Sequence, residues 1–142
     1  MTDSDTQVGG PAPRPCASCP YRLDVPSGIW AREQYTKLIA YDRPTWDQPP
    51  NLFLCHQTSA DDDRARLCAG WVGCHGDELL ALRLPQPSLT DADRASAQTY
   101  ASAIPLFPNA TAAAKHGLRE IDNPSMQAQD LIDKIKQRRP DV

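Results

Sequence analysis

Four of the five cysteines in this chain of 142 residues are spaced as ligands of a single metal centre. Cys16 and Cys19 form a Cys-x2-Cys knuckle, in which one tight turn directs two sulfurs toward the same ion. Cys55 follows a short apolar segment, and Cys68 opens the sequence Cys-Ala-Gly-Trp. Four thiolates supplied in this way hold zinc in a tetrahedron or anchor an iron–sulfur cluster. The spacing therefore predicts a four-cysteine site made of Cys16, Cys19, Cys55 and Cys68.

Two histidines leave the ligand set open. His56 directly follows Cys55, and it either replaces that cysteine or donates a hydrogen bond to the ligands. His75 lies next to the fifth cysteine, Cys74, and this pair is an alternative to Cys68. Separate buried thiols and a redox-active knuckle also stay open as alternatives to a metal site. No βαβ pattern surrounds the knuckle, which disfavours the redox alternative.

The metal that we expect is Zn²⁺, with a [4Fe–4S] cluster as the alternative because Cys followed by Pro also occurs at iron–sulfur ligands. A zinc site with four protein ligands is closed, and closed sites stabilise folds rather than catalyse reactions. The expected function is a zinc-stabilised binding or regulatory module, and a closed site favours a role without catalysis but leaves an enzyme open. One alternative is an iron–sulfur redox or sensor protein. Another is a zinc hydrolase with an open coordination position, in which His56 or His75 serves as ligand or base.

Three residues beside the cysteines are candidates for contact with a partner, which is either a protein or a nucleic acid. Tyr21 and Arg22 follow the knuckle, and a ring beside a guanidinium suits base stacking and phosphate contact. Trp71 follows Gly70, which permits a close backbone approach. The alternative is that Tyr21 and Trp71 pack over the metal site. Arg22 and Arg66 also carry charges that would offset four thiolates.

The composition narrows the class of protein. A net charge of −3 gives no strongly basic face for nucleic acid. No apolar run approaches the roughly 18 residues of a membrane span, and the polar N-terminus is unlike a signal peptide. We therefore expect a cytoplasmic protein without a membrane partner, in which thiols stay reduced. An aromatic content of 6% and 14 prolines predict a modest core that a metal would stabilise.

The elements that must position these residues are mainly helical, and the length indicates one domain. We expect a disordered leader at 1–15 and a single metal-binding domain at 16–142. That domain divides into a cysteine-rich half at 16–84 and a helical half at 88–140. The fold class is mainly α, with a small β element at 52–54 that delivers Cys55. Helices are expected at 30–41, 64–73, 78–84, 91–103 after a capping box at Thr90–Asp93, from an Asn109 cap to Gly117, and at 125–138.

The order of the motifs resembles an uncharacterised family of small cysteine-rich proteins from actinobacteria and their bacteriophages. The motifs are Cys-x-x-Cys-Pro-aromatic-Arg at 16–22, Phe-x-Cys-His at 53–56 and Cys-Ala-Gly-Trp at 68–71. The resemblance covers residues 16–84 well and the remainder loosely. It implies that the four cysteines act as a set with His56 as neighbour, and that Cys74 is not a ligand. It also favours a phage or mobile-element origin.

Overall fold

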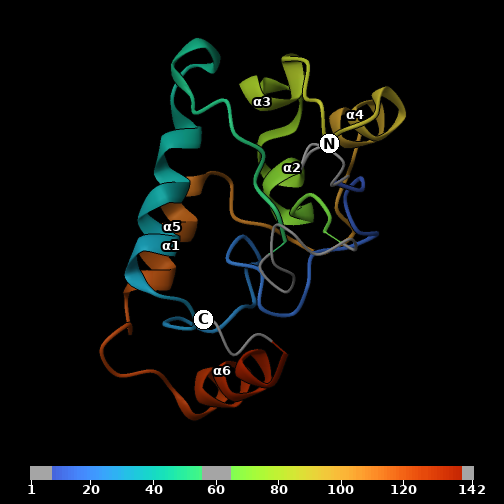
Figure 1. Cartoon of the computed structure of the whole chain (residues 1–142). Helices are drawn as coiled ribbons and strands as arrows, with labels where there is room; N and C mark the ends of the chain where they lie inside the picture. The colour runs from blue at the N-terminus through green and yellow to red at the C-terminus, as the bar shows by residue number, and fades with distance from the viewer. Residues whose placement is uncertain (1–7, 56–64, 139–142) are drawn as a thin grey trace.

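Helices are the regular structure of this protein, whose computed structural model describes residues 8–55 and 65–138 (Figure 1). The mainly helical class and the single domain are therefore confirmed. None of the described helices combines the length and the apolar character that crossing a membrane requires. The α-helices are α1 (Arg32–Thr36), α2 (Ala69–His75), α3 (Leu80–Arg83), α4 (Asp91–Gln98), α5 (Ala110–Leu118) and α6 (Met126–Arg138), and the 3-10 helices are η2 (Lys37–Asp42), η3 (Thr45–Asp47) and η4 (Gly76–Glu78).

The small β element of the prediction is reduced to isolated β-bridges. Within 8–55 and 65–138 the backbone forms no strand. One antiparallel bridge pairs Leu54 with Leu67, at the end of the segment that was expected to be a strand. The other two bridges pair Gly9 with Arg66 and Arg22 with Leu106. The apolar run at 52–54 is thus extended, but too short and too isolated to build a sheet.

Side-chain caps begin α4 and α5, as the sequence predicts. The Thr90 hydroxyl accepts a hydrogen bond from the Asp93 backbone N–H at 3.1 Å, which begins α4. The Asn109 side chain accepts one from the Ala112 N–H at 2.8 Å, which begins α5. Each cap satisfies one of the N–H groups that a helix leaves unpaired at its start.

Other helix boundaries differ from the prediction. The helix expected at 64–73 begins only at Ala69, so Cys68 precedes α2 instead of lying inside it. The helix expected at 91–103 ends at Gln98. Gly117 lies within α5 and does not end it, because the helix continues to Leu118. These differences arise because tertiary contacts, and not local propensity, decide where short helices stop.

The segment 8–15 is held against the domain by hydrogen bonds. The Val8 N–H donates to Ser88 O at 2.8 Å, and the Leu67 N–H donates to Gly9 O at 3.1 Å. The Arg66 guanidinium donates to Gly10 O at 3.2 Å. These residues therefore differ from the disordered leader that the sequence predicts. Residues 1–7 of that leader lie outside the described residues.

Two apolar clusters form the core. The first surrounds Trp71 of α2, whose ring lies 5.5 Å from that of Tyr41 and 6.1 Å from that of Phe53, centroid to centroid. The second lies between α1, α5 and α6, and it contains Ala128 and Ile135 on the inner face of α6. Figure 1 shows α5 beside α1, and α6 at the opposite end of the molecule from α3. Cys19 and Cys68 belong to the first cluster, and Cys16 and Cys74 pack against it.

Candidate metal centre

A turn forms the knuckle as the sequence predicts. The Cys19 N–H donates to Cys16 O at 3.0 Å, and the Arg22 N–H donates to Cys19 O at 3.1 Å. Cys19 is buried, and Cys16 is partly exposed. The indole N–H of Trp30 donates to Ser18 O at 2.9 Å, which ties this turn to the second core cluster. The two knuckle sulfurs are therefore presented from a backbone that is fixed on both sides.

The Leu54–Leu67 bridge brings the other two cysteines together. The Cys55 N–H donates to Arg66 O at 2.8 Å, so these two residues pair across the bridge. Cys68 lies two residues beyond Arg66, which makes it a diagonal neighbour of Cys55 on the same face. Two cysteines separated by twelve intervening residues thus share one side of a short extended pair.

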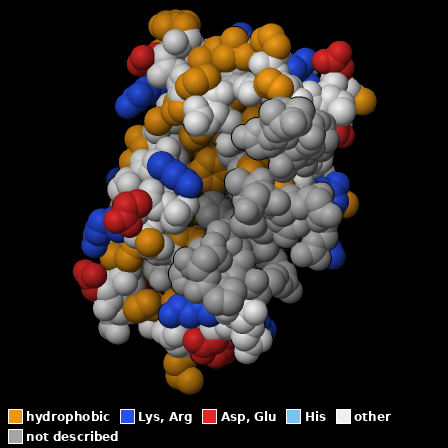
Figure 2. Space-filling view, viewed as in Figure 1, with side chains coloured by type: hydrophobic (Ala, Val, Ile, Leu, Met, Phe, Trp, Pro, Cys, Tyr) orange, Lys and Arg blue, Asp and Glu red, His pale blue; other side chains and the backbone are white. Residues whose placement is uncertain are grey.

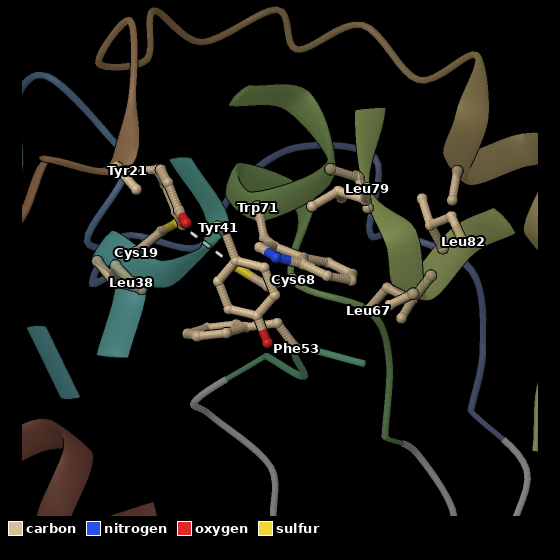
Figure 3. Close-up of a cluster of buried hydrophobic side chains, with 14 of the residues drawn as sticks. Cys19, Tyr21, Leu38, Tyr41, Phe53, Leu67, Cys68, Trp71, Leu79 and Leu82 are labelled. Carbon is tan, nitrogen blue, oxygen red and sulfur yellow. Dashed lines mark hydrogen bonds between the residues drawn. The ribbon is translucent and has the colours of Figure 1, made fainter. Parts of the chain in front are cut away.

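The sulfurs of the four cysteines meet in two pairs. Cys19 Sγ and Cys68 Sγ lie 3.8 Å apart, and a dashed line joins them in Figure 3. The Cys16 thiol interacts with Cys55 and lies 3.6 Å from the Ser18 hydroxyl. Negative charge on either Cys16 or Cys19 also disfavours ionisation of Cys68, which links the two pairs electrostatically. The structure therefore joins all four sequence-predicted cysteines in one neighbourhood.

One thiol of each pair has a shifted pKa. The hydrogen bond with Cys55 lowers the pKa of Cys16 to about 6, against the opposing effect of burial. The hydrogen bond with Cys19 and burial together raise the pKa of Cys68 well above its ordinary value.

Cys, His, Asp and Glu side chains nevertheless form no ready-made metal-holding group of three or more in the part of the chain that the structure describes. His56 lies outside that part. His75 shares a hydrogen bond of 3.0 Å with the Tyr21 hydroxyl, and burial lowers its pKa to about 4. The Cys74 thiol donates to Phe107 O at 3.5 Å, and burial raises its pKa to about 12.

Gly70 of α2 lies against the knuckle. A methyl group at this position would overlap Cys19 Sγ and lie 2.8 Å from Tyr21 Cβ. The absence of a side chain therefore lets the first turn of α2 lie directly over the knuckle sulfur, as expected for a glycine at a close backbone approach.

Tyr21 and Trp71 are not surface residues. Both have 0% of their surface exposed, so the assignment of these two side chains to partner contact is wrong. They are instead packed in the cluster of Figure 3. The indole N–H of Trp71 has no hydrogen-bond partner among the described residues. A fully buried donor without an acceptor is costly.

The two arginines near the site have other partners. Arg22 donates to both carboxylate oxygens of Asp24 at 2.7 Å, while the charges of Cys16 and Cys19 also favour its cationic form. Arg66 binds carbonyl groups of the N-terminal segment. Sequence reasoning missed Lys37, whose ammonium lies 4.9 Å from the Phe53 centroid and interacts with the charge of Cys68. No motif in the sequence marks that lysine.

The fold and this site define a small, mainly helical domain with four clustered cysteines. The chain belongs to DUF6283, a family of unknown function, which it matches over residues 11–139. This agrees with the uncharacterised family that the motifs indicate. No curated protein and no solved structure matches the chain.

Proposed function

We propose that this protein is a zinc-stabilised module in which Cys16, Cys19, Cys55 and Cys68 bind one Zn²⁺. The observation that carries the proposal is the 3.8 Å separation of Cys19 Sγ and Cys68 Sγ. A tetrahedral ion with Zn–S distances of about 2.3 Å places its ligand sulfurs about 3.8 Å apart. The pair thus has the geometry of one edge of the tetrahedron. Closing the site requires that the Cys16–Cys55 pair approach this edge, because the described residues hold no metal-binding group of three or more.

Three features of the surroundings fit a bound cation with four thiolates. Gly70 allows the first turn of α2 to lie directly against Cys19 Sγ, where a methyl group would overlap the sulfur. The backbone N–H of Trp71 already favours the thiolate of Cys68, and the unpaired indole N–H of the same residue lies in the same cluster. Thiolates that bind a metal keep negative charge and accept such N–H groups. These residues therefore fit a Zn²⁺ ion held by four thiolates.

The same separation favours one ion over a four-iron cluster. Ligands of a [4Fe–4S] cluster bind different iron atoms, with sulfide between them, so their sulfurs lie farther apart than two ligands of one ion. The iron–sulfur redox or sensor protein is therefore the second candidate. The zinc hydrolase requires an open position, and four thiolate ligands would leave none.

A closed centre would tie the knuckle to the bridge at Leu54 and to the start of α2, and the surface would then carry the activity. Trp46 of η3 is 82% exposed, yet its turn is fixed, because Thr45 donates to Glu78 O at 2.7 Å. Hydrophobic side chains gather at the end of the molecule that carries α3 (Figure 2). With a net charge of −3, these features support a protein partner over a nucleic acid. A cytoplasmic location and an actinobacterial or phage origin remain part of this proposal.

Metal analysis tests the proposal. Protein purified without oxygen should contain about one zinc per chain and show no absorbance near 400 nm, where iron–sulfur clusters absorb. Serine variants of the four ligands should each lose the zinc. Cys74→Ser is the matched control and should keep it, since Cys74 faces Phe107. Iron with sulfide would establish the second candidate, and folded protein that contains neither zinc nor iron would refute both.

A further inference from the structure

Each cysteine of the knuckle pairs with a cysteine far along the chain, and not with the other cysteine of the knuckle. We call this arrangement the crossed pattern. Cys19 faces Cys68 at 3.8 Å, and Cys16 interacts with Cys55. Each half of the Cys-x2-Cys motif therefore contacts a cysteine from the middle of the chain. This differs from a thioredoxin-type motif, in which the two cysteines of the knuckle pair with each other.

We propose that a peroxide oxidises this centre in the crossed pattern, forming Cys16–Cys55 and Cys19–Cys68 disulfides and releasing the metal. The inference rests on the proposed zinc centre and assigns it a redox-controlled state. With the ion bound, four thiolates hold the knuckle; with the ion released, two covalent bonds join the same four positions.

The chemistry balances with a peroxide as the only oxidant. One sulfur of a pair attacks the peroxide O–O bond, becomes a sulfenic acid and releases one water, or an alcohol if the peroxide is organic. The second sulfur displaces the hydroxyl of that sulfenic acid as a second water, and the S–S bond forms. Each disulfide reduces one hydrogen peroxide to two waters and takes up two protons. Two peroxides therefore convert the centre into two disulfides, one free Zn²⁺ and four waters.

Burial sets the order of the two steps. Cys16 and Cys55 are partly exposed, whereas Cys19 and Cys68 are buried. A peroxide in solution reaches the exposed pair first, since oxidation follows access to the sulfur. Loss of two ligands leaves the ion on Cys19 and Cys68 alone, and these sulfurs then need to approach by about 1.8 Å to reach disulfide length.

The backbone opposes the competing bond within the knuckle. The Cys19 N–H to Cys16 O hydrogen bond of 3.0 Å holds the turn, and Trp30 fixes Ser18 between the two cysteines. Pairing Cys16 with Cys19 would withdraw Cys19 from its buried position against Gly70 and Cys68. In the crossed pattern, each sulfur bonds to the cysteine that it already contacts.

Titration of the zinc-loaded Cys74→Ser protein with hydrogen peroxide tests the inference. Zinc release is followed with a chromogenic chelator, and remaining thiols are alkylated before a non-reducing tryptic digest and fragment-ion mass spectrometry. Two equivalents should release all zinc and reduce the alkylated thiols from four to none. The digest should join the tryptic peptides 1–22, 38–64 and 67–83, with Cys16–Cys55 formed after the first equivalent.

Two variants in the Cys74→Ser background give a matched comparison. The variant Cys16→Ser/Cys55→Ser keeps the facing pair, and Cys16→Ser/Cys68→Ser keeps Cys19 with Cys55. At complete oxidation the facing pair should give at least about tenfold more intramolecular disulfide, because that bond needs little backbone movement. The yield is compared and not the rate, since Cys55 is more accessible to peroxide than Cys19 or Cys68. Equal disulfide yields in variants whose far-UV spectra show a folded chain would contradict the crossed pattern; in unfolded variants the peptide map alone decides.

The outcomes separate this inference from the proposed function. An unlinked peptide 1–22 that has lost two hydrogens would contain a Cys16–Cys19 disulfide, and this would overturn the crossed pattern. Zinc that stays bound after two equivalents of peroxide would also overturn the inference. Either result leaves the zinc centre itself established. Purified protein without zinc that still forms both crossed disulfides would refute the zinc centre and the release step, while the pairing would stand.

Discussion

Gly117 of α5 lies directly beneath the ring of Tyr35 in α1. A methyl group on Gly117 would overlap three ring atoms of Tyr35. The Tyr35 hydroxyl in turn accepts hydrogen bonds from the backbone N–H groups of Ile29 and Trp30, at 3.0 and 3.2 Å. The ring is therefore fixed from both ends, and it joins α5 to the loop that precedes α1.

Gly117→Ala should destabilise the protein by about 1–3 kcal/mol, because the ring has no free direction in which to move. Helix propensity alone predicts the opposite, a gain of about 1 kcal/mol for alanine inside a helix. Urea unfolding at neutral pH measures the difference. Gly9→Ala is the control and should be near neutral, since its nearest heavy atom would lie at 3.6 Å. A more stable Gly117→Ala protein would disprove this packing.

Gly70→Ala should weaken zinc binding by at least about tenfold, because the new methyl group displaces Cys19 Sγ from its pair with Cys68. Competition with a zinc chelator provides the measurement. Gly73→Ala in the same helix is the matched control, since its methyl group meets the flexible end of Leu106 at 2.8 Å. Equal zinc affinities of the two variants would show that Gly70 has no special part in the site.

His75 should make the protein less stable in acid. Burial holds its pKa at about 4 in the folded state, against 6.5 for an unperturbed histidine. Between these values the unfolded chain binds more protons, so this contribution is complete above pH 6.5 and is lost as the pH falls toward 4. The loss amounts to at most about 3 kcal/mol.

Urea unfolding of wild type and His75→Gln at pH 7 and pH 4.5 isolates this contribution. The two proteins should differ less at pH 4.5 than at pH 7, because glutamine does not titrate and the other groups contribute equally to both. A difference that is independent of pH would show that His75 is not held neutral in the folded state.

Asp42 should stabilise the start of α5. Its carboxylate accepts hydrogen bonds from the Ala110 and Thr111 N–H groups at 2.8 and 2.7 Å, and from the Thr111 hydroxyl. Burial opposes ionisation, but these bonds outweigh it and lower the pKa of Asp42. Its contribution is therefore complete above the pKa of the unfolded chain, and it is lost as the pH falls through the folded value.

Asp42→Ala should lower the free energy of unfolding by about 1–2 kcal/mol at pH 7, as for the loss of a helix cap. Thermal or urea unfolding gives the value. Asp47→Ala in η3 is the control and should stay within about 0.5 kcal/mol, as is usual for exposed positions. Equal losses in the two variants would mean that the contacts with α5 contribute nothing.

Features that depend only on residues close together in the chain could be predicted from the sequence. The caps at Thr90 and Asn109 are short-range hydrogen bonds, so the residues alone identify them. The inner face of α6 follows from the spacing of Ala128 and Ile135 along one helix. The knuckle turn at Cys16 and Cys19 is likewise a property of four consecutive residues.

Only the tertiary structure decided which side chains meet across long stretches of chain. The sequence could group four cysteines, but not pair Cys19 with Cys68, because that contact depends on how α2 lies on the knuckle at Gly70. It could not place Tyr21 and Trp71 inside the core, since an aromatic residue beside a polar motif suits a surface equally well. Burial is a property of the assembled chain, and the sequence specifies it only where periodicity marks a face.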